Sequence, residues 1–344
     1  MRIAILGYGG VGRAFLQLLK DKKEKLLKEG IDPKVMYVIS SKGGVYDSNG
    51  IDIEEFIGFS KINRDITKYP SGGSTKLRFD NILENKDVDF VIEMTPTNKD
   101  TGEPGMTHIT KSLESGFNVI TANKGPILLG YKRLSQIARE NNVQLGIGCT
   151  SGGALPTING GIMDMAGSDI LSIEGVLNGT TNFILNEMES TGVEYSEALK
   201  KAQDSGIAET DPTLDVEGWD TATKLLILTN VLMNVEKTLD DIKVEGITSI
   251  KASDIKEAVK EGKKYKLVGK TVKNENGLEM SVGLERLSSD NPLYGVDGKN
   301  KAVRYTSDTL GDLTLIGGAS GVTPAAASIL RDLINIHRGY KFIK

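Results

Sequence analysis

Lysines and carboxylates of this 344-residue chain gather in two short segments. The first, Thr121-Ala122-Asn123-Lys124, follows a strand-like run at residues 118–121. A lysine ammonium can stabilise negative charge that develops on a ligand, and it can donate a proton. Open α/β sheets bind ligands at the carboxyl ends of their strands, and this spacing puts Lys124 there. Lys124 is therefore a candidate site residue.

The second segment, residues 208–224, is rich in acids and runs into a predicted helix over 220–235. Asp220 and Lys224 are four residues apart and so share one face of that helix, in line with apolar residues at Leu228, Val231 and Val235. A charged pair on an apolar stripe is expensive to bury without partners, which favours a position lining a cleft. An ordinary salt bridge at a helix start is the alternative, and the spacing alone leaves it open.

A glycine-rich turn, Gly7-Tyr8-Gly9-Gly10-Val11-Gly12, fits the pattern G-x-G-x-x-G. It lies directly after a strand and before an apolar-periodic helix, which is the context that a dinucleotide site requires. The first glycine allows the tight turn, the second lets the backbone approach a pyrophosphate, and the third lets helix and strand pack closely. A glycine-rich turn in another kind of α/β protein is the alternative.

The end of the second strand bears on the choice of coenzyme. An NAD site would place Asp or Glu there to bind the ribose hydroxyls, but this chain has Ser40, Ser41 and Lys42. Two hydroxyls and a cation suit a 2′-phosphate better, and Arg13 begins close by. We therefore expect NADP, with NAD possible if Lys42 simply points to solvent.

The elements that must position these residues change character along the chain. Up to about residue 147, strand-like runs alternate with helical patterns, which predicts a Rossmann-type, doubly wound parallel sheet of the α/β class. The expected strands are residues 3–6, 35–39, 88–94, 118–121 and 143–147. The pairs Gly43-Gly44 and Gly72-Gly73 are expected in loops.

A second, α+β domain follows. Its expected helices are 196–204 and 220–235, and its expected strands are 242–247, 265–272 and 278–284. A last helix at 323–336 is expected to pack back on the first domain. The predicted domains are residues 1–147 with 318–344, and residues 148–317.

Composition narrows the function classes. The chain has 42 Lys and Arg against 46 Asp and Glu, a net charge of −4, so no basic excess indicates a nucleic-acid partner. No signal peptide or membrane-length apolar run is visible, and we expect a cytoplasmic protein that binds a small molecule and no membrane. The single cysteine excludes an internal disulfide, and two separated histidines argue against a metal site.

Taken together, these motifs resemble the homoserine dehydrogenase family over nearly the whole chain. They comprise the turn at 7–12, Thr121 to Lys124, Leu177-Asn178-Gly179-Thr180-Thr181-Asn182-Phe183-Ile184-Leu185, Glu209 to Lys224, and Gly318-Ala319 with Thr323. The resemblance implies a short form without a regulatory domain, and a homodimer formed through the second domain. It implies interconversion of L-aspartate 4-semialdehyde and L-homoserine, in threonine and methionine biosynthesis.

The resemblance also implies roles for individual residues. Lys124, Asp220 and Lys224 would form the catalytic centre, Glu209 and Asp215 would hold the substrate, and Asn178, Gly179 and Thr180 would form part of its pocket. The expected coenzyme contacts are Gly7, Gly9, Gly10, Val11, Gly12, Arg13, Ser40, Ser41, Lys42, Thr95, Lys124 and Thr323.

The chain departs from the family pattern at two positions. Family members have a glutamate before the Gly-Gly-x-x-Pro turn, where it completes a monovalent-cation site, but Gly148 stands at that position here. We therefore expect no metal site at this turn. Ile207 replaces the family's usual tyrosine two residues before Glu209, so any contact of that ring is absent.

The sequence leaves two alternative functions open. Cys149 suggests an aldehyde dehydrogenase with a cysteine nucleophile, but such a cysteine needs a basic partner, and His108 and His337 both lie outside the second domain. A nucleotide sensor without turnover is also conceivable, although the retained Lys124, Asp220 and Lys224 argue against it.

Overall fold

The computed structural model describes residues 1–343, which form two compact units. Among these residues, the first unit comprises 1–150 together with 321–343, and the second comprises 151–320. The sequence placed the divisions at 147 and 317. No helix among the described residues has the length and apolar character needed to span a bilayer.

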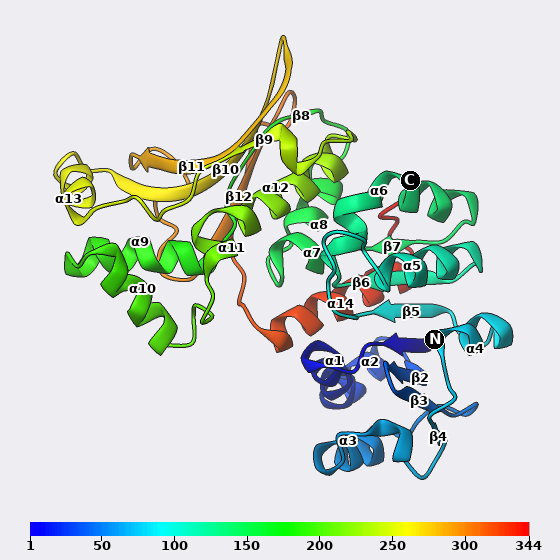
Figure 1. The fold of residues 1–344 in the computed structure, drawn as a ribbon. Helices are drawn as coiled ribbons and strands as arrows, with labels where there is room; N and C mark the ends of the chain where they lie inside the picture. The colour runs from blue at the N-terminus through cyan, green and yellow to red at the C-terminus, as the bar shows by residue number, and fades with distance from the viewer. Residues whose placement is uncertain (344) are drawn as a thin grey trace. The chain divides into compact units, whose positions relative to one another are not determined.

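The first unit is built on a seven-stranded sheet in the order β4-β3-β2-β1-β5-β6-β7 (Figure 1). Five strands run parallel, namely β1 (Arg2–Leu6), β2 (Lys34–Ser40), β5 (Phe90–Glu93), β6 (Asn118–Thr121) and β7 (Leu145–Gly146). Their apolar residues are almost all buried, as in a sheet covered on both faces. The predicted doubly wound fold is confirmed.

Two antiparallel strands that the sequence did not predict extend this sheet. They are β3 (Gly43–Tyr46) and β4 (Gly73–Ser74). Gly43-Gly44 and Gly73 therefore lie in strands, and expecting loops there was wrong. The physical reason is close strand approach, because a Cβ on Gly44 would lie 2.6 Å from the Val38 carbonyl oxygen.

The helices and short turns of the first unit are α1 (Gly10–Asp21), α2 (Lys23–Lys28), α3 (Ile53–Ile62), η1 (Ile66–Lys68), α4 (Phe79–Asn85), α5 (Gly105–Glu114), α6 (Lys124–Glu140) and α14 (Val322–His337). The short helix α7 (Cys149–Gly152) contains the division between the two units. The last helix, α14, contacts α1, β6 and β7, and its residues Ala326, Ile329 and Leu333 are fully buried. The end of the chain thus completes the unit that its beginning starts.

The second unit contains a six-stranded sheet in the order β13-β12-β8-β10-β11-β9. Its strands are β8 (Ile170–Val176), β9 (Ile242–Val244), β10 (Lys264–Asn274), β11 (Gly277–Leu287), β12 (Lys301–Ser307) and β13 (Asp312–Gly317). Only β9, β10 and β11 were predicted from the sequence. The hairpin of β10 and β11 is long, and its tip extends beyond the helices of its unit (Figure 1).

Helices of the second unit are α8 (Thr157–Met163), α9 (Gly179–Thr191), α10 (Tyr195–Asp204), α11 (Thr213–Val216), α12 (Trp219–Leu232), η2 (Leu239–Asp241) and α13 (Ala252–Lys260). Of these, α9, α12 and α13 contact β10. The helix predicted over 220–235 ends at Leu232, because the chain turns at Met233 and Asn234 adopts a left-handed conformation (φ 53°).

Candidate active site

The glycine turn of the first unit has the shape that a dinucleotide requires. Gly7 has φ 97°, and a Cβ there would lie 2.5 Å from the Met94 carbonyl oxygen. A Cβ on Gly12 would lie 2.3 Å from the Gly7 carbonyl oxygen, so the helix packs directly on the turn. A Cβ on Gly9 would meet nothing within 4 Å. The turn is closed toward the protein and open at Gly9, so it fits an approaching pyrophosphate at the start of α1.

Two other predicted contacts lie against this turn. Arg13 lies over the Tyr8 ring, with its guanidinium carbon 5.1 Å from the ring centroid, and donates to the Ser60 carbonyl oxygen at 3.3 Å. Burial raises the pKa of the Tyr8 hydroxyl, which the Ser60 hydrogen bond and the Arg13 charge partly offset. The first turn of α14, which carries Thr323, approaches the same place, because a Cβ on Gly10 would lie 2.9 Å from a Val322 methyl.

The predicted 2′-phosphate residues form a tight turn. Ser40 pairs with Gly43 at the base of the β2–β3 hairpin, which leaves Ser41 and Lys42 exposed at its tip. The Ser40 hydroxyl donates to the Gly43 carbonyl oxygen at 3.0 Å. No carboxylate follows β2 directly, and the nearby Asp65 has its pKa lowered by a Thr67 hydrogen bond and, more weakly, by the Lys42 charge.

Lys124 begins α6, and its neighbour Asn123 caps that helix. The Asn123 side chain accepts from the Gly125 amide at 3.1 Å and donates to the Thr95 carbonyl oxygen at 3.3 Å. The structure thus joins two of the predicted coenzyme-site segments, the one at Thr95 after β5 and the one at Lys124 after β6.

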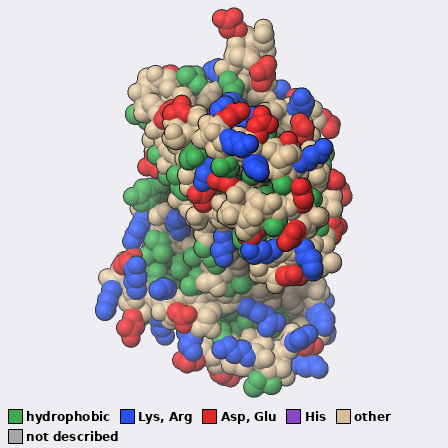
Figure 2. All heavy atoms as spheres, turned by 90° about the vertical axis from the view of Figure 1, so that its left-hand side faces the viewer, with side chains coloured by type: hydrophobic (Ala, Val, Ile, Leu, Met, Phe, Trp, Pro, Cys, Tyr) green, Lys and Arg blue, Asp and Glu red, His purple; other side chains and the backbone are tan. Residues whose placement is uncertain are grey.

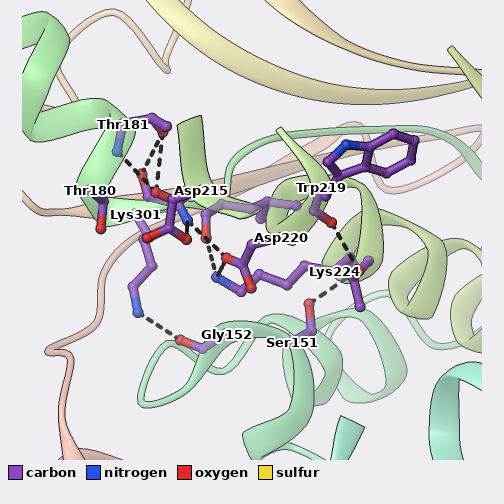
Figure 3. A network of polar contacts seen from close by, with 12 residues as sticks. Ser151, Gly152, Thr180, Thr181, Asp215, Trp219, Asp220, Lys224 and Lys301 are labelled. Atoms are coloured by element: carbon purple, nitrogen blue, oxygen red, sulfur yellow. Dashed lines mark hydrogen bonds and ion pairs between the residues drawn. The ribbon is translucent and has the colours of Figure 1, made fainter. Parts of the chain in front are cut away.

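In the second unit, four predicted side chains form one hydrogen-bonded network (Figure 3). The amide nitrogen of Asn178 donates to Oδ1 of Asp215 at 2.6 Å and to Oδ2 of Asp220 at 2.9 Å. Nζ of Lys224 lies 2.5 Å from the same Asp220 oxygen and donates to the Leu177 carbonyl oxygen at 2.8 Å. The Asp220 and Lys224 side chains are 17% and 13% exposed, so the pair is mostly shielded from water.

Helix ends explain why these residues meet. Asn178 caps α9, where its side-chain oxygen accepts from the Thr181 amide at 2.9 Å, leaving its nitrogen for the two carboxylates. Gly218 has φ 89° and turns the chain from α11 into α12, so that Asp215 and Asp220 both face Asn178. The Ser151 hydroxyl donates to the Lys224 carbonyl oxygen at 3.3 Å, a contact that no sequence signal predicted.

The remaining predicted substrate residues, Gly179, Thr180 and Glu209, make contacts outside this network. The Thr180 hydroxyl donates to the Ile207 carbonyl oxygen at 3.2 Å, and Gly179 lies where a Cβ would be 2.8 Å from the Lys299 carbonyl oxygen. Glu209 is exposed, and Gln203 donates to its backbone carbonyl at 3.2 Å. The structure does not join the Glu209 carboxylate to the network.

The turn after Gly148 is held by polar side chains. The Gly148 amide donates to Asp332 at 2.8 Å, within the first unit. In the second unit, buried Lys301 donates to the Gly152 carbonyl oxygen at 3.1 Å (Figure 3). Among residues 1–343, no three His, Cys, Asp or Glu side chains cluster as metal ligands would. Cys149 is buried at the start of α7.

Surface charge of both signs is interspersed on the face that Figure 2 shows, in line with the small net charge of −4.

Comparisons with known proteins identify the family. A family model for homoserine dehydrogenase matches residues 156–334, and one for the homoserine dehydrogenase NAD-binding domain matches residues 7–147. The chain is 38% identical over 341 residues to the homoserine dehydrogenase of Methanocaldococcus jannaschii, covering 99% of this chain and 100% of that one. The chain belongs to the homoserine dehydrogenase family.

Two further relatives agree with this assignment. The NAD(+)-dependent homoserine dehydrogenase of Pseudomonas canavaninivorans is 35% identical, with coverage of 98% of this chain and 96% of the relative. A crystal structure of an Archaeoglobus fulgidus protein assigned to homoserine dehydrogenase matches with a TM-score of 0.86 at 29% identity, covering 98% and 99% of the two chains. As a homoserine dehydrogenase, the chain is an NAD(P)-dependent oxidoreductase that acts on a CH–OH group.

Proposed function

We propose that this homoserine dehydrogenase reduces L-aspartate 4-semialdehyde to L-homoserine, and catalyses the reverse reaction, in threonine and methionine biosynthesis. The observation that carries the proposal is the network of Asn178, Asp215, Asp220 and Lys224, which concentrates shielded, hydrogen-bonded charges at two helix ends. Such a cluster suits a small substrate that carries an ammonium, a carboxylate and a reacting oxygen.

The reaction needs one group that stabilises negative charge on the carbonyl oxygen and one that supplies a proton to that oxygen. A coenzyme held at the glycine turn of the first unit would supply the hydride for the aldehyde carbon. Negative charge then develops on the carbonyl oxygen, and the Lys124 and Lys224 ammonium groups are the proposed donors that stabilise it and deliver the proton. Asp220 orients Lys224 through their 2.5 Å contact.

Substrate binding is assigned to acidic residues both within this cluster and outside it. We assign Glu209 and Asp215 to the substrate ammonium or hydroxyl through charge-assisted hydrogen bonds, and Asn178, Gly179 and Thr180 to the pocket wall. Exposed Glu209 is available to an incoming cation.

For the coenzyme, we propose NADP in preference to NAD. The supporting feature is the β2–β3 turn, where Ser41 and Lys42 are exposed and no carboxylate follows the strand. The Pseudomonas canavaninivorans relative is named for NAD(+), so the choice within the family needs measurement.

The proposal extends to assembly and location: a homodimer formed through the second unit, in the cytoplasm. Along its sheet, Glu174 pairs with Lys270 at 2.8 Å and with Arg304 at 3.5 Å, and Ile316 on the edge strand is 52% exposed. Light scattering of the purified chain tests for the dimer. If an Ile316→Asp variant remained dimeric, the interface would not include this edge strand. Fractionation of cells tests the location.

The decisive experiment is a direct assay. Purified protein is mixed with L-homoserine and NADP or NAD, and the formation of reduced nicotinamide is followed by absorbance. Coenzyme-dependent oxidation of homoserine is expected. If the coenzyme is reduced only when the semialdehyde and phosphate are supplied, thioester chemistry at Cys149 is indicated instead. If the coenzyme binds and no substrate is turned over, the chain is a nucleotide sensor.

A further inference from the structure

Glu93 is a fully buried carboxylate for which the proposed mechanism has no role. It is the last residue of β5, and its side chain is 0% exposed. Burying a carboxylate is costly unless hydrogen bonds satisfy it, so each of its contacts needs an account.

One oxygen of Glu93 fixes the chain that follows β5. Oε1 accepts from the Thr95 backbone amide at 2.9 Å and also from the Thr95 hydroxyl, and Nδ1 of His108 lies 3.9 Å from it. The two Thr95 hydrogen bonds fix the position of Thr95 directly after the strand. Thr95 is one of the proposed coenzyme contacts.

The other oxygen reaches the neighbouring strand. Oε2 accepts from the Thr121 hydroxyl at 2.9 Å, and Thr121 is paired with Glu93 across the β5–β6 ladder. The Thr121 hydroxyl oxygen also accepts from the Asn123 backbone amide at 2.9 Å. The hydroxyl proton of Thr121 is therefore directed to Glu93. This chain of donors ends one residue before Lys124.

Asn123 closes the arrangement. Its side-chain nitrogen donates to the Thr95 and Pro96 carbonyl oxygens at 3.3 and 3.4 Å, while its side-chain oxygen accepts from the Gly125 amide and so caps α6. The site is tightly filled, because a Cβ on Gly105 would lie 2.6 Å from the Asn123 amide nitrogen and 3.3 Å from Oε2 of Glu93. The start of α6 and the turn after β5 are thus held by one carboxylate.

We propose that Glu93 is a positioning residue that sets the coenzyme-side turn at Thr95 and the Lys124 ammonium in one fixed relation. Glu93 acts through Thr95 on one side and through Thr121 and Asn123 on the other. This inference rests on the proposed roles of Lys124 and of the coenzyme site. A displacement of about 1 Å in a reacting geometry is enough to lower a rate roughly 100-fold, so loss of this tie should be visible in turnover.

The test separates the two branches of the network. Glu93→Gln keeps the shape but turns an NH₂ toward one of the donors, so kcat should fall at least tenfold and the coenzyme dissociation constant should rise at least threefold. Thr121→Val removes only the branch toward Lys124, so kcat should fall while coenzyme affinity stays within twofold of wild type. Thr121→Ser keeps the hydroxyl and should restore kcat.

Asp89→Asn is the matched control. Asp89 precedes the same strand at its other end, where its carboxylate accepts from the Arg2 amide at 2.8 Å and from the Arg2 guanidinium. This variant should lower Tm and leave kcat and coenzyme affinity unchanged, as a purely structural contact would. Folded Glu93→Gln protein with near-wild-type kcat and coenzyme affinity would overturn the proposal, as would equal kinetic losses in Asp89→Asn.

Parallel assays of wild type and Lys124→Ala separate this inference from the function that it rests on. If wild type does not oxidise homoserine, or Lys124→Ala keeps its turnover, the proposed function fails and the inference fails with it. If both behave as proposed and Glu93→Gln turns over normally, only the role of Glu93 is lost.

Discussion

The amide nitrogen of Asn178 lies 2.6 Å from Oδ1 of Asp215, while the oxygen of the same side chain caps α9. One residue therefore fixes a helix start and joins the carboxylates of two other elements. The carboxylates of Asp215 and Asp220 are therefore held in place by the same side chain.

Replacing Lys224 with Ala should lower kcat by roughly 100-fold or more, because one electrostatic donor to the developing oxyanion is lost. Asp220→Asn should show the same signature, since its carboxylate holds Nζ of Lys224 at 2.5 Å. Steady-state kinetics on folded protein measure the effect, and fluorescence checks that coenzyme binding is unchanged.

If the pair were only a structural salt bridge, Lys224→Ala would lower the stability of the fold and leave turnover nearly intact. Near-wild-type kcat in that variant would end the catalytic assignment.

Glu209→Ala should chiefly raise the Michaelis constant for homoserine, because the carboxylate is proposed to bind the substrate cation and not the reacting oxygen. Exposed Glu217 on the same segment provides the control, and Glu217→Ala should leave both constants unchanged. A fall in kcat without a change in the Michaelis constant would contradict the binding role of Glu209.

Ser41→Asp should invert the coenzyme preference. The added carboxylate would bind the ribose hydroxyls of NAD and repel a 2′-phosphate at the tip of the β2–β3 turn. Michaelis constants for NADPH and NADH, measured for wild type and variant, give the answer. Ser48→Asp adds the same charge at another exposed position and should not shift the ratio; a wild type that favours NADH would refute the prediction.

Sodium and potassium should affect activity only weakly. Gly148 offers no carboxylate to a hard cation, and the ammonium of Lys301 already donates to the Gly152 carbonyl oxygen of the same turn. The check is activity titrated with each salt against choline chloride at constant ionic strength. Saturable, ion-selective activation of tenfold or more would be the contrary result.

Asp297→Asn should destabilise the second unit at neutral pH. Burial tends to raise the pKa of Asp297, but the Lys264 hydrogen bond and the Lys266 charge outweigh it and hold that pKa below 3.8. The carboxylate therefore stabilises the fold above pH 3.8, and this contribution is lost as the pH falls through the lowered pKa. Because water screens half-exposed Asp297, the loss at pH 7 should be about 1 kcal/mol.

Thermal unfolding at several pH values measures this effect. The Tm of the variant should fall less steeply than that of wild type as the pH is lowered into the acid range. The exposed pair of Lys200 and Asp204 is the comparison, and Asp204→Asn should barely change Tm. Equal shifts in the two variants would show that Asp297 has no special contact.

Local patterns in the sequence predicted those features that neighbouring residues determine. The turn at 7–12 and the Asp220–Lys224 pair depend on spacing within one element, and the structure shows both. Strand β8 went unpredicted because its pairing joins residues far apart in the chain, such as Ile173 and Tyr305 of β12. Strands β12 and β13 form a local hairpin, which was also not predicted. Glu93 was hidden for a similar reason: it reads as the polar end of an apolar run, and only the fold brings Thr121 to it.

The return of α14 to α1 bears on how the polypeptide is made. On the ribosome, residues 151–320 emerge as one continuous stretch and can form their sheet as soon as they are clear of the exit tunnel. The unit begun by residues 1–150 still lacks the helix that buries Ala326, Ile329 and Leu333. The first unit therefore stays incomplete on its α1 side until residues 322–337 have been synthesised and can pack there.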